Sequence, residues 1–199
     1  MPWRYRSGWL ALACLTACTA PAPTRVAATF DPIQARHQLE PGSNEITGSA
    51  VLWLSSGGVV SCAGESVWLY PVTHYAREWA RLNYDTVERR KSSPPDFSYR
   101  PQAAGPAGLV VDPAFESSRR GGTCDADGHF DFTAVGDGEY FVVASIVWQR
   151  DIWDEHTFFH GSQYSDLNGT VMKRVRVQGG QKATVAMKWT VPSARYNFW

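Results

Sequence analysis

The stretch that decides the fold is residues 125–140, which read DADGHFDFTAVGDGEY. Within it, polar and apolar side chains alternate over His129–Val135, as they do in a β-strand with one buried face. Asp127-Gly128 before this segment and Gly138 after it are typical of tight turns, because glycine adopts backbone angles that other residues avoid. The stretch therefore predicts a strand between two turns. The residues expected to face the core are Phe130, Phe132 and Ala134, and those expected to face solvent are His129, Asp131 and Thr133.

The same two-residue alternation continues through most of the chain. It covers Ile46–Leu54, Ser66–Val72, Glu139–Gln149, Val171–Val177 and Lys182–Trp189. Glu139–Gln149 is apolar on both faces, which indicates a central strand covered on both sides. Gly179-Gly180 lies between the last two segments and predicts that they form a hairpin. The pattern predicts an all-β protein, a β-sandwich of about seven strands.

Three segments depart from this alternation. His74–Tyr84 has its apolar residues at helical spacing and predicts one short helix. Arg89–Ala107 contains four prolines, and Arg150–Gly169 is polar and aromatic, so both are predicted to be long loops. Loops of this length in a compact domain are usually functional or disordered.

The composition is that of a globular protein with balanced charge. The 199 residues include 19 Lys and Arg against 19 Asp and Glu, and 44% of them are hydrophobic. The hydrophobic fraction excludes a wholly disordered chain. The zero net charge argues against a protein that binds nucleic acid by neutralising phosphates. No apolar run reaches the ~18 residues that a transmembrane helix needs.

Residues 1–17 are predicted to be a signal peptide. Arg4 and Arg6 precede a short apolar segment that ends in Leu15-Thr16-Ala17-Cys18. This order resembles the bacterial lipoprotein signal, so Cys18 is expected to carry lipid and to begin the mature chain. The alternative is an ordinary secretory signal cut at a nearby small-residue site, with Cys18 incidental.

The remaining chain divides around the expected sandwich. Residues 18–44 are predicted to be a tether, residues 45–190 the β-sandwich, and residues 191–199 a C-terminal tail. Thr19, rather than Asp, follows the cysteine, which resembles the pattern sent on to the outer membrane in organisms with two membranes. The expected location is therefore the cell envelope, with the lipid anchor in the outer membrane.

The four cysteines leave one pair for the folded domain. Cys14 lies in the signal peptide and Cys18 is expected to carry lipid, so Cys62 and Cys124 remain. Exported proteins meet an oxidising compartment, which favours a disulfide between these two. A two-cysteine metal site is the alternative, but no Cys-x-x-Cys spacing supports it.

Residues 125–140 also resemble a motif of carboxypeptidase regulatory-like domains. The motif is the pair of turns in Asp125–Phe132 and Gly136–Tyr140. Ile46–Gly48 and Cys62–Pro71 are similar to the opening strands of these domains, and Val175–Val185 resembles their closing hairpin. The resemblance implies a transthyretin-like (prealbumin-like) β-sandwich in an uncharacterised bacterial lipoprotein. It implies a fold and no activity.

Metal and catalytic signatures are weak. Asp125, Asp127 and Asp131 have the early spacing of a calcium loop, but the glycine and the closing glutamate of such a loop are missing. His156 and His160 are four residues apart, as are His74 and Glu78, yet neither pair has a third ligand or an HExxH motif. Nucleophile and phosphate-loop motifs are also absent from the sequence. We expect no enzyme activity, no metal and no cofactor.

The nine tryptophans suggest where a ligand could bind. Trp53, Trp68, Trp148 and Trp189 lie on predicted strands and are expected in the core, whereas Trp79, Trp153 and Trp199 are expected to be exposed. Aromatic rings beside acidic groups can stack on sugars. The candidate ligand contacts are Trp153, His156, Phe158, Phe159, His160 and Tyr164, all in the second long loop.

The sequence favours a lipid-anchored, non-catalytic module of the cell envelope that serves protein interaction or structure. The alternative is a glycan-binding module of the starch-binding type. The expected partners are thus the membrane, through the anchor, and an envelope protein or a glycan. Nucleic acid is not among them.

Overall fold

The smaller of two β-sheets is built around β1 (Asn44–Trp53). Along one side of β1, β9 (Lys182–Thr190) pairs in parallel over nine positions. Along the other side, β6 (His129–Val135) pairs with the first half of β1 and β2 (Val59–Ser61) with its end, both antiparallel.

The structure is a computed structural model. It describes residues 23–54, 57–84, 97–101, 109–152 and 163–190, with side chains except at 97–101, 149–152 and 163–168.

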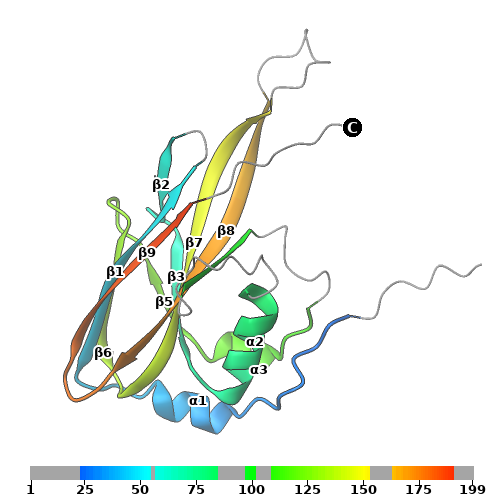
Figure 1. Ribbon diagram of the computed structural model, residues 1–199. Helices are drawn as coiled ribbons and strands as arrows, with labels where there is room; N and C mark the ends of the chain where they lie inside the picture. The colour runs from blue at the N-terminus through cyan, green and yellow to red at the C-terminus, as the bar shows by residue number, and fades with distance from the viewer. Residues whose placement is uncertain (1–22, 55–56, 85–96, 102–108, 153–162, 191–199) are drawn as a thin grey trace, which may run out of the picture.

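The larger sheet has the strand order β4-β8-β7-β3-β5, with every pair of neighbours antiparallel. These strands are β3 (Ser66–Pro71), β4 (Phe97–Pro101), β5 (Arg120–Thr123), β7 (Gly138–Ile152) and β8 (Gln163–Val177). β7 and β8 form a hairpin of 15 paired positions, which extends past the ends of its neighbours (Figure 1). The two sheets face each other, so the all-β sandwich is confirmed.

Helices cover the face of the larger sheet that points away from the smaller one (Figure 1). They are α1 (Pro32–Gln38), α2 (His74–Tyr84) and α3 (Pro113–Ser117). The helix predicted at 74–84 is confirmed in its full length, and two further short helices accompany it. Among the described residues, no helix is long and apolar enough to cross a membrane.

Two separate cores result from this three-layer arrangement. Between the sheets lie aliphatic and aromatic side chains such as Ile46, Leu52 and Phe132. Between the larger sheet and the helices lies a mainly aromatic cluster, to which Phe30, Tyr70, Tyr75, Trp79, Tyr84, Phe115 and Phe141 belong. β7 contributes to both cores, with Tyr140 and Val142 on one side and Phe141 and Val143 on the other. This explains why its sequence is apolar on both faces.

The predicted hairpin between the last two strands is wrong. β9 pairs with β1 in the smaller sheet, whereas β8 lies in the larger one. Gly179 and Gly180 do form a turn with positive φ, but this turn is held against the start of β1. The backbone N–H of Gln181 donates to the Asn44 side chain at 2.8 Å, and that of Gly179 donates to Asp137 at 2.9 Å. The turn therefore carries the chain from one sheet to the other.

The strand at 129–135 is confirmed, but one of its inward residues is not. Phe130 and Phe132 are buried, whereas Ala134 is exposed and Val135 is buried instead. A bulge causes the change, because two residues of β6 lie opposite the single residue Glu45 of β1. Ala134 has a φ of 51° at this point.

Two tryptophans were assigned to the wrong environment. Trp79 is only 7% exposed, because its position on α2 turns it into the aromatic cluster. Trp53 is 47% exposed, since it lies at an outward position of β1.

Both predicted long loops are shorter than expected. Phe97–Pro101, within the first, is strand β4 and pairs with β8. Of the second, residues 150–152 and 163–169 belong to the β7–β8 hairpin, whose last pair is Ile152 with Gln163. The edge of the long β8 provides the hydrogen-bonding partner that local sequence does not reveal.

The predicted tether is also largely part of the folded domain. Asp31 caps α1 by accepting hydrogen bonds from two backbone N–H groups, and Phe30 and Ala35 are buried. The Glu78 carboxylate accepts the backbone N–H groups of Ala27 and Ala28, which lowers its pKa. Among the described residues, the packed chain thus extends back to about residue 24 and does not start at residue 45.

Candidate functional site

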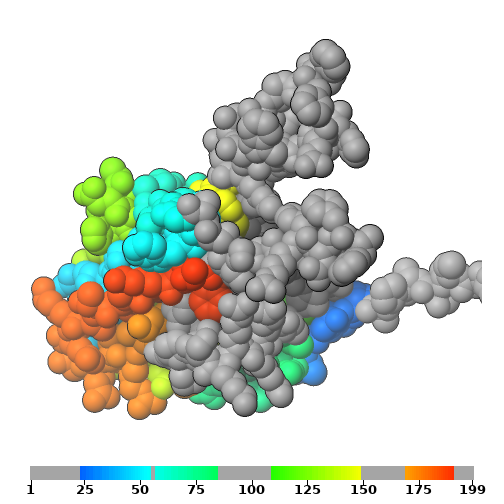
Figure 2. Space-filling model, turned by 45° about the horizontal axis from the view of Figure 1, so that its top comes forward, coloured from blue at the N-terminus to red at the C-terminus, as the bar shows by residue number. Residues whose placement is uncertain are grey.

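The outward side of the smaller sheet carries polar side chains in register. We call outer face the surface formed by Thr47 and Ser49 of β1, His129 and Asp131 of β6, and Thr184 and Ala186 of β9. Thr47 lies opposite Asp131 on one side and Thr184 on the other, and Ser49 lies opposite His129 and Ala186. Two rows of three side chains therefore cross the sheet. Figure 2 shows β9, in orange to red, running along the surface beside the cyan residues of β1 and β2.

A hollow of about 450 Å³ lies over these rows and also touches Thr123 and Asp125. The side chains that β1 and β9 turn towards it are short, namely Thr47, Ser49, Thr184 and Ala186. Beneath it, Gly48 leaves room for the ring of Phe130, and a Cβ at this position would collide with that ring and with the Val185 carbonyl oxygen. The glycine therefore lets three strands pack closely under an open surface.

The polar groups of the hollow are available to a ligand. Within the described part of the chain, no hydrogen bond or ion pair engages the side chains of Thr47, Ser49, Thr184 or Asp131. At one end of the same face, Lys182 and Glu45 form an ion pair of 2.8 Å. The hydrogen bond to Glu45 raises the pKa of Lys182. The face thus offers hydroxyls and a carboxylate in the middle and a neutralised charge pair at the end.

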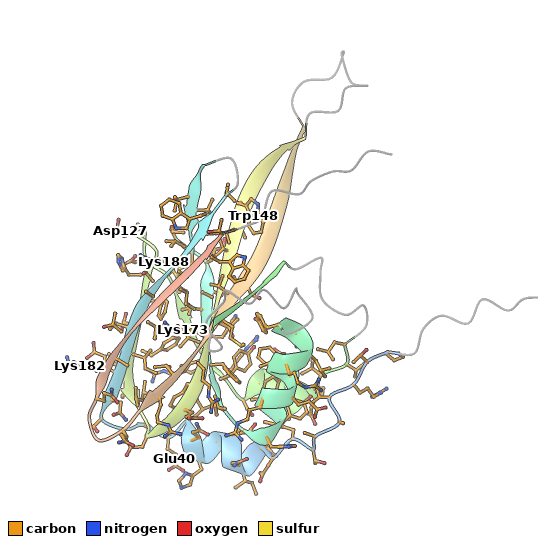
Figure 3. The ribbon with its side chains drawn as sticks, in the orientation of Figure 1. Glu40, Asp127, Trp148, Lys173, Lys182 and Lys188 are labelled. Carbon is orange, nitrogen blue, oxygen red and sulfur yellow. A yellow bond between two sulfur atoms is a disulfide. The ribbon has the colours of Figure 1, made fainter. Side chains whose placement is uncertain are left out.

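The opposite end of this sheet surface is apolar. Trp53 and Val59 are cross-strand neighbours and are 47% and 50% exposed. Between this end and the hollow, Lys188 of β9 lies opposite Val51 of β1. Figure 3 labels Lys188 on the same side of the molecule as Lys182 and Asp127. From Thr47 to Trp53 the strand rises by about 20 Å. The Trp53 indole and the hydroxyl groups of Thr47 and Thr184 are therefore separated by a distance that several linked sugar rings would span.

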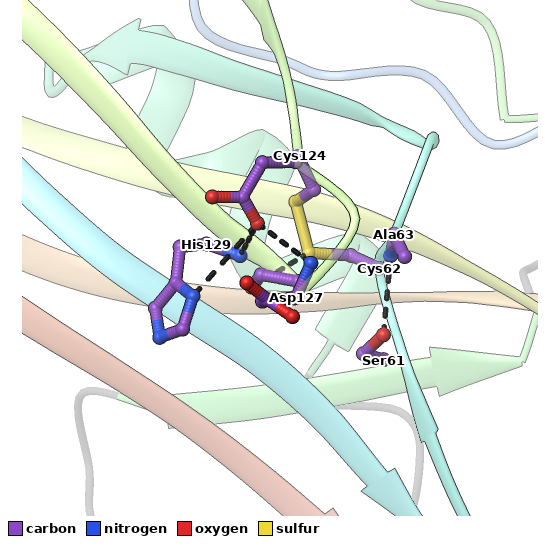
Figure 4. The surroundings of a disulfide bond; sticks show 8 residues. Ser61, Cys62, Ala63, Cys124, Asp127 and His129 are labelled. Atoms are coloured by element: carbon purple, nitrogen blue, oxygen red, sulfur yellow. Dashed lines mark hydrogen bonds and ion pairs between the residues drawn. A yellow bond between two sulfur atoms is a disulfide. The ribbon is translucent and has the colours of Figure 1, made fainter.

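The turn at 125–128 adjoins the hollow through Asp125, and Figure 4 shows its side chains beside the disulfide. Oδ1 of Asp125 accepts the backbone N–H groups of His129 at 2.8 Å and Asp127 at 2.9 Å. These bonds, that of His129 foremost, lower the pKa of Asp125. Ligand atoms of Asp125, Asp127 and His129 lie within 4.8 Å of one another, and all three residues are exposed. The Asp125 carboxylate braces a tight turn through its two hydrogen bonds. Asp131, the third acid of the calcium-like spacing, lies on the outer face.

The predicted disulfide is confirmed beside this turn. Cys62 and Cys124 are bonded, with their Cα atoms 5.8 Å apart. Cys62 follows β2 of the smaller sheet and Cys124 follows β5 of the larger one, so the bond links the two sheets. Gly128 packs here as well, because a Cβ at its position would come within 2.6 Å of the Ser61 Cβ.

Most of the candidate residues from the sequence are outside the part of the chain that the structure describes. Cys18, Trp153, His156, Phe158, Phe159, His160 and Trp199 lie outside the described residues, so nothing tests them. Tyr164 is in β8 opposite Asp151. The predicted pair His74 and Glu78 lies on α2, where Glu78 holds the N-terminal segment.

The sequence did not predict that the outward residues of three strands form one continuous surface, the outer face. The alternation did place Thr47, Ser49 and Trp53 on one face of their strand, and His129 and Asp131 outward on theirs. The signal that these faces adjoin is the pairing of β1 with β9 and β6, which the alternation of single segments does not contain.

Comparison with known proteins supports the fold. No protein-family model matches the chain, and no curated protein matches it significantly. A crystal structure from Pseudomonas aeruginosa, described as that of a "putative carbohydrate binding protein", superposes with a TM-score of 0.57 at 22% sequence identity. The match covers 81% of this chain and 98% of that one. At this identity the likeness establishes a shared architecture, and the resemblance to carboxypeptidase regulatory-like domains stays a prediction.

Proposed function

We propose that this protein is a lipid-anchored, non-catalytic β-sandwich of the cell envelope that binds glycans on its outer face. The observation that carries the proposal is the hollow across β9, β1 and β6, with unengaged hydroxyls and a carboxylate and with an exposed indole at the end of the sheet. Sugars combine many hydroxyls with apolar ring faces. A site for them therefore needs hydrogen-bonding groups and an aromatic surface, and both are present here. The description of the Pseudomonas aeruginosa neighbour agrees with this assignment.

The shape of the face favours an extended oligosaccharide over a single sugar. The polar rows and Trp53 lie along one strand, about 20 Å from end to end. A short chain of sugars could lie along β1, with one ring on Trp53 and others against Ser49 and Thr47. A monosaccharide would meet only one of the two surfaces.

Binding without hydrolysis fits the carboxylates near the hollow. Hydrolysis of a glycosidic bond commonly uses two carboxyl groups, one of them protonated to act as an acid. Asp125 is held ionised by two backbone N–H groups, and Glu45 is paired with Lys182. Both carboxylates are thus already engaged within the protein, and Asp131 is the carboxylate that we expect to face the sugar hydroxyls.

The binding proposal predicts the effect of filling the hollow. Ala186 is exposed on β9 in the row of Ser49 and His129, so Ala186→Tyr should occupy the space a sugar needs and weaken binding at least about tenfold. Calorimetric titration with maltohexaose, cellohexaose and chitohexaose measures the effect. Thr133→Tyr is the matched control, because it adds the same ring to an exposed position of β6 outside the hollow. Equal affinity of the Ala186→Tyr variant and the parent protein would contradict the proposal.

The anchor is a separate prediction. Mass spectrometry of the protein from the membranes of its host should show a mature chain that begins at Cys18 and carries acyl chains. Cys18→Ala should release the protein from the membrane fraction. An unmodified mature protein, or unchanged membrane sorting of Cys18→Ala, would show that the anchor assignment is wrong.

Protein interaction is the second candidate function, and the β7–β8 hairpin favours it. The pairing of β3 with β7 ends at Ala144 and that of β4 with β8 at Gly169, whereas β7 and β8 remain paired as far as Ile152 and Gln163. The hairpin therefore continues as a two-stranded ribbon that pairs with no other described strand, although Ile146 and Trp148 still pack into the core between the sheets. Val147 is 39% exposed at its base. Two strands alone are only marginally stable, so a partner that binds along the ribbon would stabilise it.

A further inference from the structure

Three arginines surround one glutamate on the helix-covered side of the larger sheet. Glu139 lies near the start of β7, directly opposite Arg176 of β8. Arg174 lies two residues before Arg176 and so shares its face. Arg77 approaches from α2, which packs over this part of the sheet. The cluster thus draws on three elements and lies on a different layer of the molecule from the outer face.

The glutamate is held from several sides at once. Oε1 accepts hydrogen bonds from Nε and Nη2 of Arg176, at 2.9 and 2.5 Å, and Oε2 accepts one from Arg174. Nη2 of Arg77 is 4.0 Å from Oε2, too far for a hydrogen bond. The hydrogen bond from Arg174 is the largest cause of the lowered pKa of Glu139. The carboxylate is therefore ionised and oriented.

The arginines reach further into solvent than the glutamate does. The Glu139 side chain is 17% exposed, against 43% for Arg174, 56% for Arg77 and 71% for Arg176. The carboxylate forms the base of the cluster, and the guanidinium groups surround it. Their remaining N–H donors are open to solvent.

The cluster carries more positive charge than it neutralises. Three guanidinium charges against one carboxylate leave a surplus of two. Among the described residues, no other carboxylate lies within 4.0 Å of these three side chains. Arg77 also lies four residues into α2, near the positive end of the helix dipole, and the first turn of α2 holds no acidic residue. This arrangement is unfavourable by itself, and an added anion would relieve it.

We propose that Arg77, Arg174 and Arg176 form a binding site for a phosphoryl group. A phosphate monoester carries about −1.5 to −2 charges at pH 7, which matches the surplus better than a single carboxylate would. The planar guanidinium group donates two parallel hydrogen bonds to phosphate oxygens. Glu139 takes the role of a positioning residue, since it holds Arg174 and Arg176 with their free donors outward. The phosphoryl group can belong to a soluble compound or to a lipid headgroup.

Arg77→Gln is the variant that tests this site most cleanly. It removes one charge and one set of donors but leaves every hydrogen bond of Glu139 in place, so the fold should be unaffected. Arg81→Gln is the matched control, since Arg81 lies one turn further along the same helix and faces Glu78 at 4.0 Å. The protein is prepared with Cys18→Ser so that no acyl chain contributes to vesicle binding.

The probes are glycerol 3-phosphate in solution and phosphatidylcholine vesicles with and without phosphatidic acid. Affinity at constant ionic strength should fall at least about tenfold in Arg77→Gln and less than twofold in Arg81→Gln. An effect with glycerol 3-phosphate assigns the site to soluble phosphate esters, and an effect only with phosphatidic acid vesicles assigns it to headgroups. The proposal is overturned if neither probe binds, or if Arg81→Gln weakens binding as much as Arg77→Gln does.

Discussion

Phe115→Ala is expected to lower the free energy of unfolding by about 3–5 kcal/mol. Phe115 is 1% exposed and lies at the centre of the aromatic cluster. Its ring centroid is 4.9–5.6 Å from those of Phe30, Tyr70, Tyr75 and Trp79. These rings come from the N-terminal segment, the larger sheet and α2, so the variant removes the shared contact of three parts of the helix-covered core.

Chemical denaturation followed by tryptophan fluorescence measures the loss. Ile33→Ala is the control, because Ile33 is 70% exposed on α1 and its truncation should change stability by no more than about 0.5 kcal/mol. If Phe115→Ala costs as little as Ile33→Ala, the second core does not contribute to stability and the three-layer description is wrong.

Removing the disulfide is expected to have a similar effect. Cys62 and Cys124 are 62 residues apart, and the chain-entropy model gives about 4 kcal/mol for a closed loop of that length. The double variant Cys62→Ser/Cys124→Ser should therefore melt roughly 8–16 °C lower than the parent protein. Calorimetry measures the shift.

Thiol labelling of the unfolded protein checks the bond itself. Without reductant, neither Cys62 nor Cys124 should react, and both should react after reduction. Labelling of both residues in the unreduced protein would contradict the assignment, as would a double variant as stable as the parent protein.

The parts of the fold that could be predicted from the sequence depend on local pattern. The alternation at His129–Val135 and Lys182–Trp189 follows from a sheet with one face buried. The apolar run at 139–149 indicated cover on both faces, which the second sheet and the helices provide. The helix at His74–Tyr84 was predicted from the helical spacing of its apolar residues alone. The cysteine pair followed from the predicted export and from a count of four cysteines.

The parts that could not be predicted depend on contacts between distant segments. In the parallel pairing of β9 with β1, the turn at Gly179 is held by Asn44 and Asp137. The alternation within β9 would be the same whether β9 paired with β1 or with β8, so it could not reveal the partner. The fold of residues 24–44 depends on Glu78, 50 residues away, which binds the backbone of Ala28. Small Pro-containing sequences of this kind are extended when alone, and here they are ordered by what they pack against.

The candidate site, too, was predictable in its local pattern and not in the contacts between distant segments. The outward residues of each strand were predictable one strand at a time, but their assembly into one face was not. Trp53 illustrates this, since the alternation put it on the same strand face as Thr47 and Ser49 while it was predicted in the core, and the structure leaves it 47% exposed. The ligand contacts predicted at 153–164 stay a prediction, because all of them except Tyr164 lie outside the described residues.

The most direct test of glycan binding on the outer face is an NMR titration of the ¹⁵N-labelled protein with the hexasaccharide that binds best. The account predicts shift changes at the amides of Thr47, Ser49, His129, Asp131 and Thr184 and at the indole N–H of Trp53. These changes should saturate with the affinity found by calorimetry. Shift changes confined to residues 147–152 and 163–168 of the β7–β8 ribbon, or no change with any of the three sugars, would contradict it.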